Sequence, residues 1–326
     1  MYCANCNEGL NWCNTNYVYS EAEQRDIMLC NDCYRELAIH CACCGRSILR
    51  SEAIKTGDGR YECQQCYKHI IKEYHYHKED KVLFYNTDTE EEPLYMGVEL
   101  EVVNDEQTDF EILNENAENI AKYLGKDFVY METDGSLDDV GFEIITQPAT
   151  LKYHTNMKDN YKSAFKYCIN NNLRSHNAGI CGLHVHFNRD YFSDNEDLYL
   201  TRLLYLTEKF WDELSKFSRR SSYSLNHWAK RYNAAPEEVV EGSKYGDYDR
   251  YYAVNLTNES TIEFRIFRGT LRLETFIATL QLVDTMVKKC KSVKSAEELQ
   301  SINWEDLLIY DEIKNYWETV KNRNVR

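Results

Sequence analysis

Proline and glycine are scarce in this chain, with 3 prolines and 13 glycines among 326 residues. This composition argues against long flexible linkers. No apolar run approaches the roughly 20 residues that a membrane-spanning helix needs, so we expect no membrane anchor. The N-terminus, MYCANCNEGL, lacks a basic segment followed by an apolar one. We therefore expect no signal peptide and a cytoplasmic protein.

The sequence also lacks an excess of positive charge. Its 54 acidic and 38 basic residues give a formal net charge of −16. A general electrostatic attraction to nucleic acid or to an anionic membrane is therefore not expected. Two phosphate-binding glycine motifs are missing as well, namely GxxxxGK followed by Ser or Thr, and GxGxxG. Their absence excludes a P-loop and a kinase-type glycine loop.

Cysteine, by contrast, is abundant near the N-terminus. Ten of the 13 cysteines lie in the first 66 residues, and eight of those ten form four CxxC pairs. Two intervening residues let both thiolates of a pair reach one ion from a tight turn, and two pairs complete a tetrahedral site. Such clustering suits metal thiolates in a reducing cytoplasm better than it suits disulfides.

The four pairs repeat in order. The pairs that begin at Cys3 and Cys41 are typical of zinc knuckles, in which both cysteines lie in a tight turn. The pairs that begin at Cys30 and Cys63 each lie at the start of a helix-like segment. Residues 1–77 thus resemble two consecutive treble-clef or LIM-like zinc fingers. The repeated order favours sequential pairing over RING-like interleaved pairing. One structural zinc would then be held by Cys3, Cys6, Cys30 and Cys33, and the other by Cys41, Cys44, Cys63 and Cys66.

A second domain is expected at 94–326, after an acidic linker at 78–93 that ends in a proline. Helical periodicity marks 109–125, 150–172, 195–217, 274–291 and 303–322. Strand-like segments occupy 95–103, 127–133, 141–147, 182–188, 251–257 and 260–268. Several neighbouring strands are joined by turns too short for a crossover helix. Antiparallel pairing follows, so the fold class is α+β and not doubly wound.

Polar groups recur on one face of these strands. The period of two places Glu99 with Glu101, and His184 with His186 and Asn188, opposite apolar partners. In the same way Glu263 shares a face with Arg265. Other strands contribute Glu132, Asp134, Glu143 and Asn255. A single such pair is most often the wet side of a sheet. Several strands that carry such polar residues on the same face, with no lysine among them, indicate a shared site.

The residue types at this site predict its chemistry. Carboxylates with one or two imidazoles form a hard, mostly oxygen site that suits Mg²⁺ or Mn²⁺. Arginines beside such ions suit phosphates, because a guanidinium binds oxyanions in a bidentate way. The combination predicts phosphoryl transfer from a nucleotide on a sheet surface.

These pieces together resemble the amidoligase family of carboxylate–amine ligases, within the glutamine synthetase and glutamate–cysteine ligase superfamily. The resemblance rests on ordered segments across about 95–285: GVELEVV, ETDGSL with GFEIITQP, CGLHVHFN, SRRSSYS, and YYAVNLTNESTIEFRIFRGTL. It implies a glutamine-synthetase-like antiparallel sheet that is flanked by helices and holds ATP and divalent ions. It also implies that ATP phosphorylates a carboxylate and that an amine then attacks the acyl phosphate to form an amide.

The resemblance also implies roles for single residues. Glu99, Glu101, Glu143, His184 and Glu263 would bind Mg²⁺ or Mn²⁺, together with either Glu132 or Asp134, between which the motif does not decide. Asp134 is also a candidate catalytic residue, as the base that assists the amine, and Asp138 and Asp139 in the same turn are alternatives. His186 would lie near the ATP phosphates, and Arg265 would stabilise charge on the transferred phosphoryl group. Arg219 and Arg220 would clamp a phosphate or a substrate carboxylate. Further candidates for nucleotide binding are Asn188, Asn255 and Arg268, the last on the opposite alternation face unless a bulge intervenes.

Two other functions stay open at this point. One is a non-catalytic zinc-finger adaptor with a nucleotide-binding or decayed ligase domain, and the other is a metal-dependent hydrolase. The expected partners are a carboxylate and an amine substrate, and the fused zinc fingers favour a peptide or protein among them. The aromatic and charged segment 221–250 is expected to form a lid or an amine-substrate loop.

Overall fold

The structure is a computed structural model of the chain. It describes residues 1–56, 59–72, 82–87, 92–104, 109–137, 140–176 and 179–325. The chain divides into two compact units, Met1–Lys81 (unit 1) and Val82–Arg326 (unit 2). The predicted linker at 78–93 lies partly outside the described residues, and its boundaries stay a prediction. Within the described ranges, no helix combines the length and apolarity that a bilayer crossing requires.

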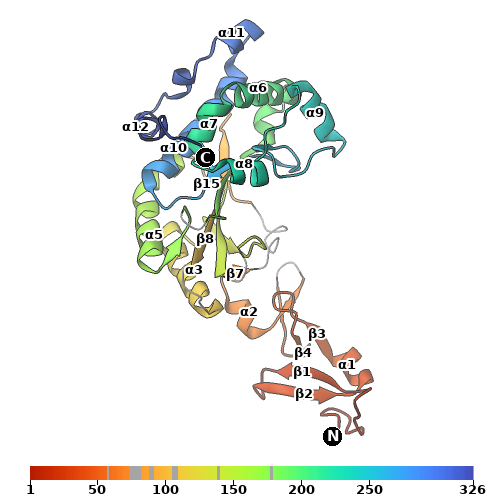
Figure 1. Ribbon diagram of the computed structural model, residues 1–326. Coiled ribbons are helices and arrows are strands. Elements are labelled where there is room, and N and C mark those ends of the chain that lie inside the picture. Colours follow the sequence, from red (N-terminus) through yellow and green to blue (C-terminus); the bar gives the residue numbers. More distant parts are fainter. Residues whose placement is uncertain are drawn as a thin grey trace. The chain divides into compact units, whose positions relative to one another are not determined.

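Unit 1 consists of small sheets and two short helices, drawn in red and orange in Figure 1. One sheet has the strand order β2-β1-β4-β3, and β5 pairs with β6. The strands are β1 (Asn16–Ser20), β2 (Arg25–Leu29), β3 (Ala38–His40), β4 (Ser47–Leu49), β5 (Ile54–Lys55), β6 (Tyr61–Glu62) and β7 (Ile71–Lys72), and the helices are α1 (Asn31–Leu37) and α2 (Gln64–Lys68). Its two hydrophobic clusters consist largely of cysteines, so little apolar surface is available to stabilise this unit.

Unit 2 is built on a large sheet with the strand order β14-β15-β13-β8-β10-β9. These strands are β8 (Tyr95–Asn104), β9 (Val129–Glu132), β10 (Gly141–Thr146), β13 (Gly182–Asn188), β14 (Val254–Asn255) and β15 (Thr261–Arg268). Two short strands, β11 (Ala149–Thr150) and β12 (Leu173–Arg174), pair with the two ends of β8. All these described pairings are antiparallel, which confirms the predicted α+β class.

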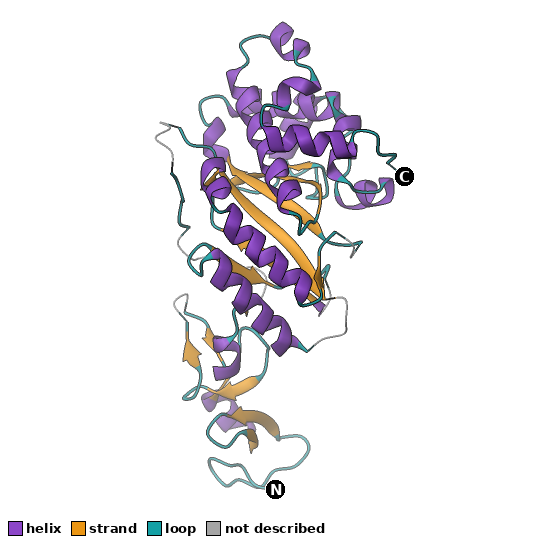
Figure 2. Ribbon diagram, turned by 90° about the vertical axis from the view of Figure 1, so that its left-hand side faces the viewer, coloured by secondary structure: helices purple, strands orange, loops and turns teal. Residues whose placement is uncertain are grey.

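Helices lie against this sheet, as Figure 2 shows. They are α3 (Phe110–Leu124), α4 (Leu151–Asn156), α5 (Lys158–Asn170), α6 (Glu196–Lys209), α7 (Trp211–Ser218), α8 (Ser222–Trp228), α9 (Pro236–Lys244), α10 (Leu273–Ser292), α11 (Ala296–Ser301) and α12 (Asp311–Val320), with 3-10 turns η3 (Arg189–Phe192) and η4 (Trp304–Leu307). Alternate strand residues such as Leu100, Val185 and Phe264 are buried. Burial of this apolar face leaves the opposite, polar face for the site.

Some predicted elements are divided in the structure. The helical pattern at 150–172 breaks at Met157, and that at 195–217 breaks at Phe210, whose ring packs 5.7 Å from that of Trp304. The pattern at 303–322 becomes η4 followed by α12, because the intervening Leu308 is buried in a non-helical conformation. The strand predicted at 251–257 is wrong for most of its length, since β14 has two residues.

Candidate functional site

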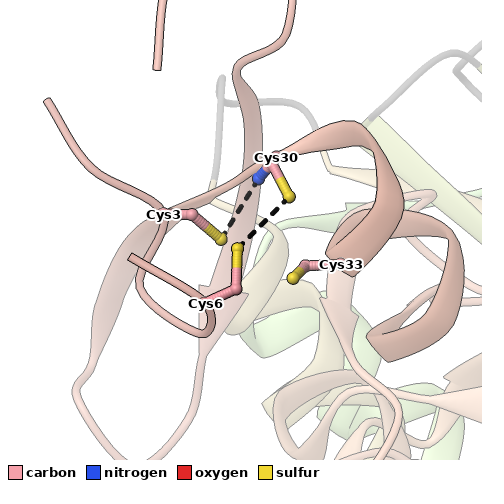
Figure 3. A group of neighbouring side chains, drawn as sticks. All are labelled: Cys3, Cys6, Cys30 and Cys33. Atoms are coloured by element: carbon pink, nitrogen blue, oxygen red, sulfur yellow. Dashed lines mark hydrogen bonds between the residues drawn. The ribbon is translucent and has the colours of Figure 1, made fainter. Parts of the chain in front are cut away.

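The eight paired cysteines form two clusters in unit 1. Figure 3 shows the first, in which the thiols of Cys3, Cys6, Cys30 and Cys33 converge. Within each cluster the sulfur atoms lie within 4.8 Å of one another. The second cluster consists of Cys41, Cys44, Cys63 and Cys66. The grouping is sequential and not interleaved.

The backbone around the clusters favours thiolates. Cys30 and Cys63 occupy the positions directly before α1 and α2, so each second pair opens a helix. Burial disfavours the thiolate of Cys3, but amide hydrogen bonds from Cys6, Cys30 and Asn5 outweigh burial and lower its pKa to about 6. The amide of Cys63 likewise donates to the sulfur of Cys41 over 3.3 Å. Four buried or clustered thiols with such donors indicate structural zinc.

The strand register of unit 2 brings the predicted carboxylates and imidazoles onto adjacent positions. Glu143 of β10 lies opposite Glu101 of β8. Glu99 of β8 lies opposite His184 of β13. On the other side of β13, His186 lies opposite Glu263 of β15. The polar face therefore carries these groups across the four strands β10, β8, β13 and β15. Figure 1 labels β8 and β15.

His184 lies at the centre of this row. Its Nδ1 is 3.3 Å from Oε2 of Glu99 and 3.5 Å from Oε1 of Glu263, and its Nε2 is 3.7 Å from Oε1 of Glu101. It therefore belongs to two groups whose ligand atoms lie within 4.8 Å of one another. The first group is Glu99, His184 and Glu263, and the second is Glu101, Glu143 and His184.

The carboxylates of the second group repel one another. Burial raises the pKa of Glu143 well above its ordinary value, and the charges of Glu99, Glu101, Asp134 and Glu132 act in the same direction. So many acids on one buried face require compensating positive charge. A divalent cation would supply that charge, and the donor set of oxygen with one imidazole fits Mg²⁺ or Mn²⁺.

Glu132 and Asp134 lie beside the two groups without belonging to either. Glu132 is buried on β9 and faces Glu143 in the strand register. Asp134 follows in the turn, where its Oδ1 accepts a hydrogen bond of 2.7 Å from the Ser136 amide. The geometry leaves open which of the two contacts an ion.

His186 lies beside two members of the first group, Glu99 and Glu263. Its Nε2 lies 3.0 Å from Oε1 of Glu99, and its Nδ1 is 3.1 Å from Oγ1 of Thr261. Burial opposes protonation, but the charges of Glu99 and Glu263 raise the pKa of His186 to about 9. The neighbouring carboxylates thus favour the protonated form of this imidazole.

The carboxylate of Glu263 accepts hydrogen bonds from Asn255 and Arg265. Nδ2 of Asn255 donates to its Oε2 over 2.8 Å, and Nη1 of Arg265 donates to its Oε1 over 2.6 Å. The guanidinium of Arg265 also lies 5.8 Å from the ring centre of Tyr251. Burial raises the pKa of Glu263, but the charges of His186, His184 and Arg265 outweigh it, so that the pKa is lowered. Asn255 thus orients a carboxylate, whereas its predicted contact with a nucleotide stays a prediction.

A bulge in β15 changes the orientation of Arg268. The register passes from Val185 opposite Phe264 to Leu183 opposite Phe267, which inserts one extra residue in β15. Arg268 then lies opposite Gly182, on the alternation of His184. The bulge that the sequence left open is therefore present, and Arg268 shares the polar face.

The adjacent arginines lie just after α7. Arg219 ends that helix with a φ of 65°, and its Nη2 donates to the carbonyls of Arg268 and Gly269 over 2.6 and 3.3 Å. Arg220 is buried, and its Nη2 donates to the Arg265 carbonyl over 3.3 Å. Burial lowers the pKa of Arg220 to about 10, against the opposing charge of Glu101. Both arginines therefore lie against β15.

Asn188 has a role in the backbone of the sheet. Its Oδ1 accepts a hydrogen bond of 3.1 Å from the amide of Tyr95, which joins the end of β13 to the start of β8. Its predicted part in nucleotide binding stays a prediction. The segment 221–250, expected to be a lid or substrate loop, contains the helices α8 and α9.

Sequence reasoning missed several residues that shape the site. A Cβ at Gly182 would lie 2.5 Å from Nε2 of His184 and 2.9 Å from Nη2 of Arg220, so a larger residue there would displace these side chains. The amide of Gly182 also donates to the Glu101 carboxylate. A signal for Gly182 was present, since it lies two residues before His184 on the same face. Thr261 and Tyr251 carried no comparable signal.

Comparisons with known proteins give limited information. No model of a known protein family matches the chain, and no curated protein matches it. One similar solved structure is the complex between the prokaryotic ubiquitin-like protein Pup and its ligase PafA. Its TM-score is 0.34 at 10% identity, over 71% of this chain and 51% of that one. Another is GmaS without ligand, with a TM-score of 0.39 at 13% identity, over 70% of this chain and 68% of that one. This chain thus spans about half the length of the first. Similarity at this level does not assign an activity.

Proposed function

We propose that unit 2 is an ATP-dependent carboxylate–amine ligase that forms an amide or isopeptide bond through an acyl phosphate. One observation supports the proposal above the others. Two groups of possible metal ligands share His184, and both lie on the same sheet face as Arg265. Nη1 of Arg265 lies 2.6 Å from Oε1 of Glu263, a member of the first group. Cation-binding carboxylates next to buried guanidinium groups are the surroundings that phosphoryl transfer between anions requires.

The proposed reaction has two steps. An oxygen of the substrate carboxylate attacks the γ-phosphorus of ATP, and the bond from that phosphorus to the bridging oxygen of ADP breaks. The nitrogen of the amine then attacks the acyl carbon of the resulting acyl phosphate. A carbon–nitrogen bond forms, phosphate leaves, and the nitrogen loses a proton to the solvent or to a base that the geometry does not identify. Phosphorylation is needed because a carboxylate is a poor electrophile at neutral pH.

The residues of the polar face have separate roles in this proposal. Glu99, Glu101, Glu143, His184 and Glu263 would hold Mg²⁺ or Mn²⁺, which when bound neutralises phosphate charge. Arg265 would bind an oxygen of the transferred phosphoryl group, and His186 would donate a hydrogen bond to the phosphates. Arg220 and Arg219 would position the carboxylate or a phosphate. Asn255 and Thr261 would orient Glu263 and His186.

The test is a trapping assay with ATP and Mg²⁺. Hydroxylamine, at high concentration, should intercept the acyl phosphate of a carboxylate substrate to give a hydroxamate, with one ADP released for each hydroxamate formed. A library of amino acids and carboxyl-rich peptides supplies the acid. Arg265→Gln should lower ADP release at least about 10²-fold. Arg25→Gln is the matched control, because the exposed Arg25 pairs with Glu23 in unit 1, outside the predicted substrate loop, and the charge change is the same.

Two outcomes would favour the other functions. Cleavage of a phosphodiester by the chain with Mn²⁺ and without ATP would identify a hydrolase. Failure of both ATP and Mn²⁺ to raise the melting temperature would favour a non-catalytic adaptor, because a ligand that binds the native state must stabilise it.

A further inference from the structure

Arg189 lies directly after β13 and has no role in the ligase resemblance or in the proposed chemistry. β13 is the strand that carries His186. The segment that Arg189 contacts is 256–260, which connects β14 to β15 and which we call the hairpin turn. One residue thus joins the end of the strand of His186 to the turn that precedes the strand of Glu263.

Arg189 binds the hairpin turn through three donors. Its Nε donates to the carbonyl of Asn258 over 2.9 Å, and its Nη2 donates to the carbonyl of Leu256 over 2.5 Å. Its backbone amide donates to the carbonyl of Ser260 over 3.1 Å. Because the donors of a guanidinium lie in one rigid plane, bonds to two carbonyls fix the turn in one orientation. The third nitrogen, Nη1, pairs with Glu196 at the start of α6.

The hairpin turn needs such support because the strand before it is short. β14 has two residues, and the second of them, Asn255, pairs with Glu263 of β15. A ladder of this length contributes few hydrogen bonds. The amide of Thr257 adds a bond of 2.8 Å to Oδ1 of Asn255. The three bonds from Arg189 therefore form a large part of what holds the turn in place.

Side chains in and beside the hairpin turn contact the site directly. Nδ2 of Asn258 lies 3.4 Å from Oγ1 of Thr261 and 3.5 Å from Oε2 of Glu263. Oγ1 of Thr261, the first residue of β15, lies 3.1 Å from Nδ1 of His186. A shift of the turn would therefore change the orientation of a carboxylate and of an imidazole together. Loss of groups that orient metal ligands typically costs about 10–100-fold in metal affinity or activity.

We propose that Arg189 is a positioning residue of the ligase. It holds the hairpin turn so that Asn258 and Thr261 keep their contacts. Those contacts fix the Glu263 carboxylate and the His186 imidazole in the arrangement that would receive the cation and the γ-phosphate. The proposal rests on the proposed function only in naming the reaction that this arrangement serves. Its effect on the turn and on Mn²⁺ binding needs neither ATP nor turnover.

Mn²⁺ titration of the full chain without ATP, followed by electron paramagnetic resonance, tests the proposal. Arg189→Lys should bind Mn²⁺ about tenfold more weakly, because an ammonium keeps the charge but cannot span two carbonyls. Glu196→Gln is the matched control and should keep the affinity of the parent, because it removes the ion pair of Arg189 and leaves its bonds to the turn. Without added metal, hydrogen exchange of residues 255–261 should be faster in Arg189→Lys and unchanged in Glu196→Gln.

A double-mutant cycle separates positioning from a general loss of stability. Asn258→Ala should weaken Mn²⁺ binding by a factor similar to that of Arg189→Lys, and the double variant should be little weaker than either, because both act through the same contacts. Thr261→Val removes the hydroxyl without changing Arg189, and Thr261→Ser, which retains the hydroxyl, should recover most of the loss. Melting temperatures establish that each variant is folded.

The contrary results are equally definite. The proposal is overturned if Arg189→Lys binds Mn²⁺ as the parent does, or if the effects of Arg189→Lys and Asn258→Ala add in full. An equal loss of affinity in Glu196→Gln would assign the effect to the ion pair with α6 and would also overturn it. Weaker Mn²⁺ binding in Arg189→Lys, with no hydroxamate from any acid in the parent, would instead count against the proposed ligase and leave the positioning role at the cation site supported.

Discussion

Nδ1 of His184 lies 3.3 Å from Oε2 of Glu99, although 85 residues separate them in the chain. The pairing of β13 with β8 sets this distance, because the two residues face each other in the register. A slip by one residue would turn either side chain to the apolar face. The sheet therefore holds an imidazole between carboxylates that would otherwise repel one another.

The first prediction concerns the metal ligands. Glu101→Gln and Glu263→Gln should each weaken Mn²⁺ binding at least about tenfold, because each removes an anionic oxygen from one group around His184. Titration of Mn²⁺ followed by electron paramagnetic resonance measures this. Glu115→Gln, on the exposed side of α3, is the control. Unchanged Mn²⁺ affinity in both site variants would show that the ions bind elsewhere.

The second prediction concerns stability without metal. Glu143→Gln should raise the melting temperature in EDTA, because it removes a carboxyl whose pKa is raised by burial and by the charges of the neighbouring acids. A gain of about 1 kcal/mol corresponds to roughly 2–4 °C for a unit of this size. In saturating Mn²⁺ the order should reverse, since the variant has lost a ligand. A lower melting temperature of the variant in EDTA would contradict the repulsion argument.

The third prediction concerns Gly182. Gly182→Ala should lower Mn²⁺ affinity and ligase turnover more than tenfold, because the added Cβ would lie 2.5 Å from Nε2 of His184. The imidazole must then leave its position between Glu99 and Glu101. Gly9→Ala, where a Cβ meets nothing within 4 Å, serves as the control for a glycine substitution. Wild-type Mn²⁺ affinity in Gly182→Ala would mean that His184 is not a ligand.

The fourth prediction concerns the pH dependence of stability. His154 is fully buried, with Nδ1 at 2.8 Å from the Tyr161 hydroxyl and Nε2 at 3.0 Å from the Met96 carbonyl. Burial lowers its pKa from 6.5 to about 4, so folding keeps the imidazole neutral. Since the unfolded chain binds the proton more tightly, this stability is present above pH 6.5 and is lost as the pH falls towards 4. The loss amounts to about 3 kcal/mol.

Urea unfolding of unit 2, followed by tryptophan fluorescence between pH 7 and 4, measures this dependence. His154→Gln should be less stable at pH 7 but should lose about 3 kcal/mol less on acidification than the parent. The exposed His227→Gln should keep the slope of the parent. Equal slopes in parent and His154→Gln would assign the acid sensitivity to other groups.

The fifth prediction concerns zinc. The purified chain should contain two zinc ions, and Cys33→Ser should contain one, because its thiol belongs to the first cluster. Cys13→Ser should keep both ions, since Cys13 is exposed and belongs to neither cluster. Native mass spectrometry gives the count. Two zinc ions in Cys33→Ser would show that a thiol outside the first cluster replaces the one removed.

Much of this arrangement follows from local sequence. The alternation in β8, β13 and β15 predicted that Glu99, His184 and Glu263 face the polar side, because successive strand residues point to opposite faces. The CxxC spacing predicted the grouping of thiols for a similar reason, since a tight turn brings both sulfur atoms to one point. The predicted antiparallel α+β class followed from short connections between strands.

Other features depend on contacts between distant segments. Interruption of the helices at Met157 and Phe210 is not visible in their periodicity, because it depends on what each end packs against. Whether Glu132 or Asp134 approaches an ion depends on the turn after β9, and the fold leaves both beside the site.

What the sequence determined by itself is which residues share a face and which thiols share a turn, since these are properties of neighbours along the chain. Only the tertiary structure decided which faces meet. The register placed His184 against Glu99, and the bulge in β15 turned Arg268 to the polar face. The physical reason is that register, bulges and packing are set by interactions summed over the whole sheet, which no single strand contains.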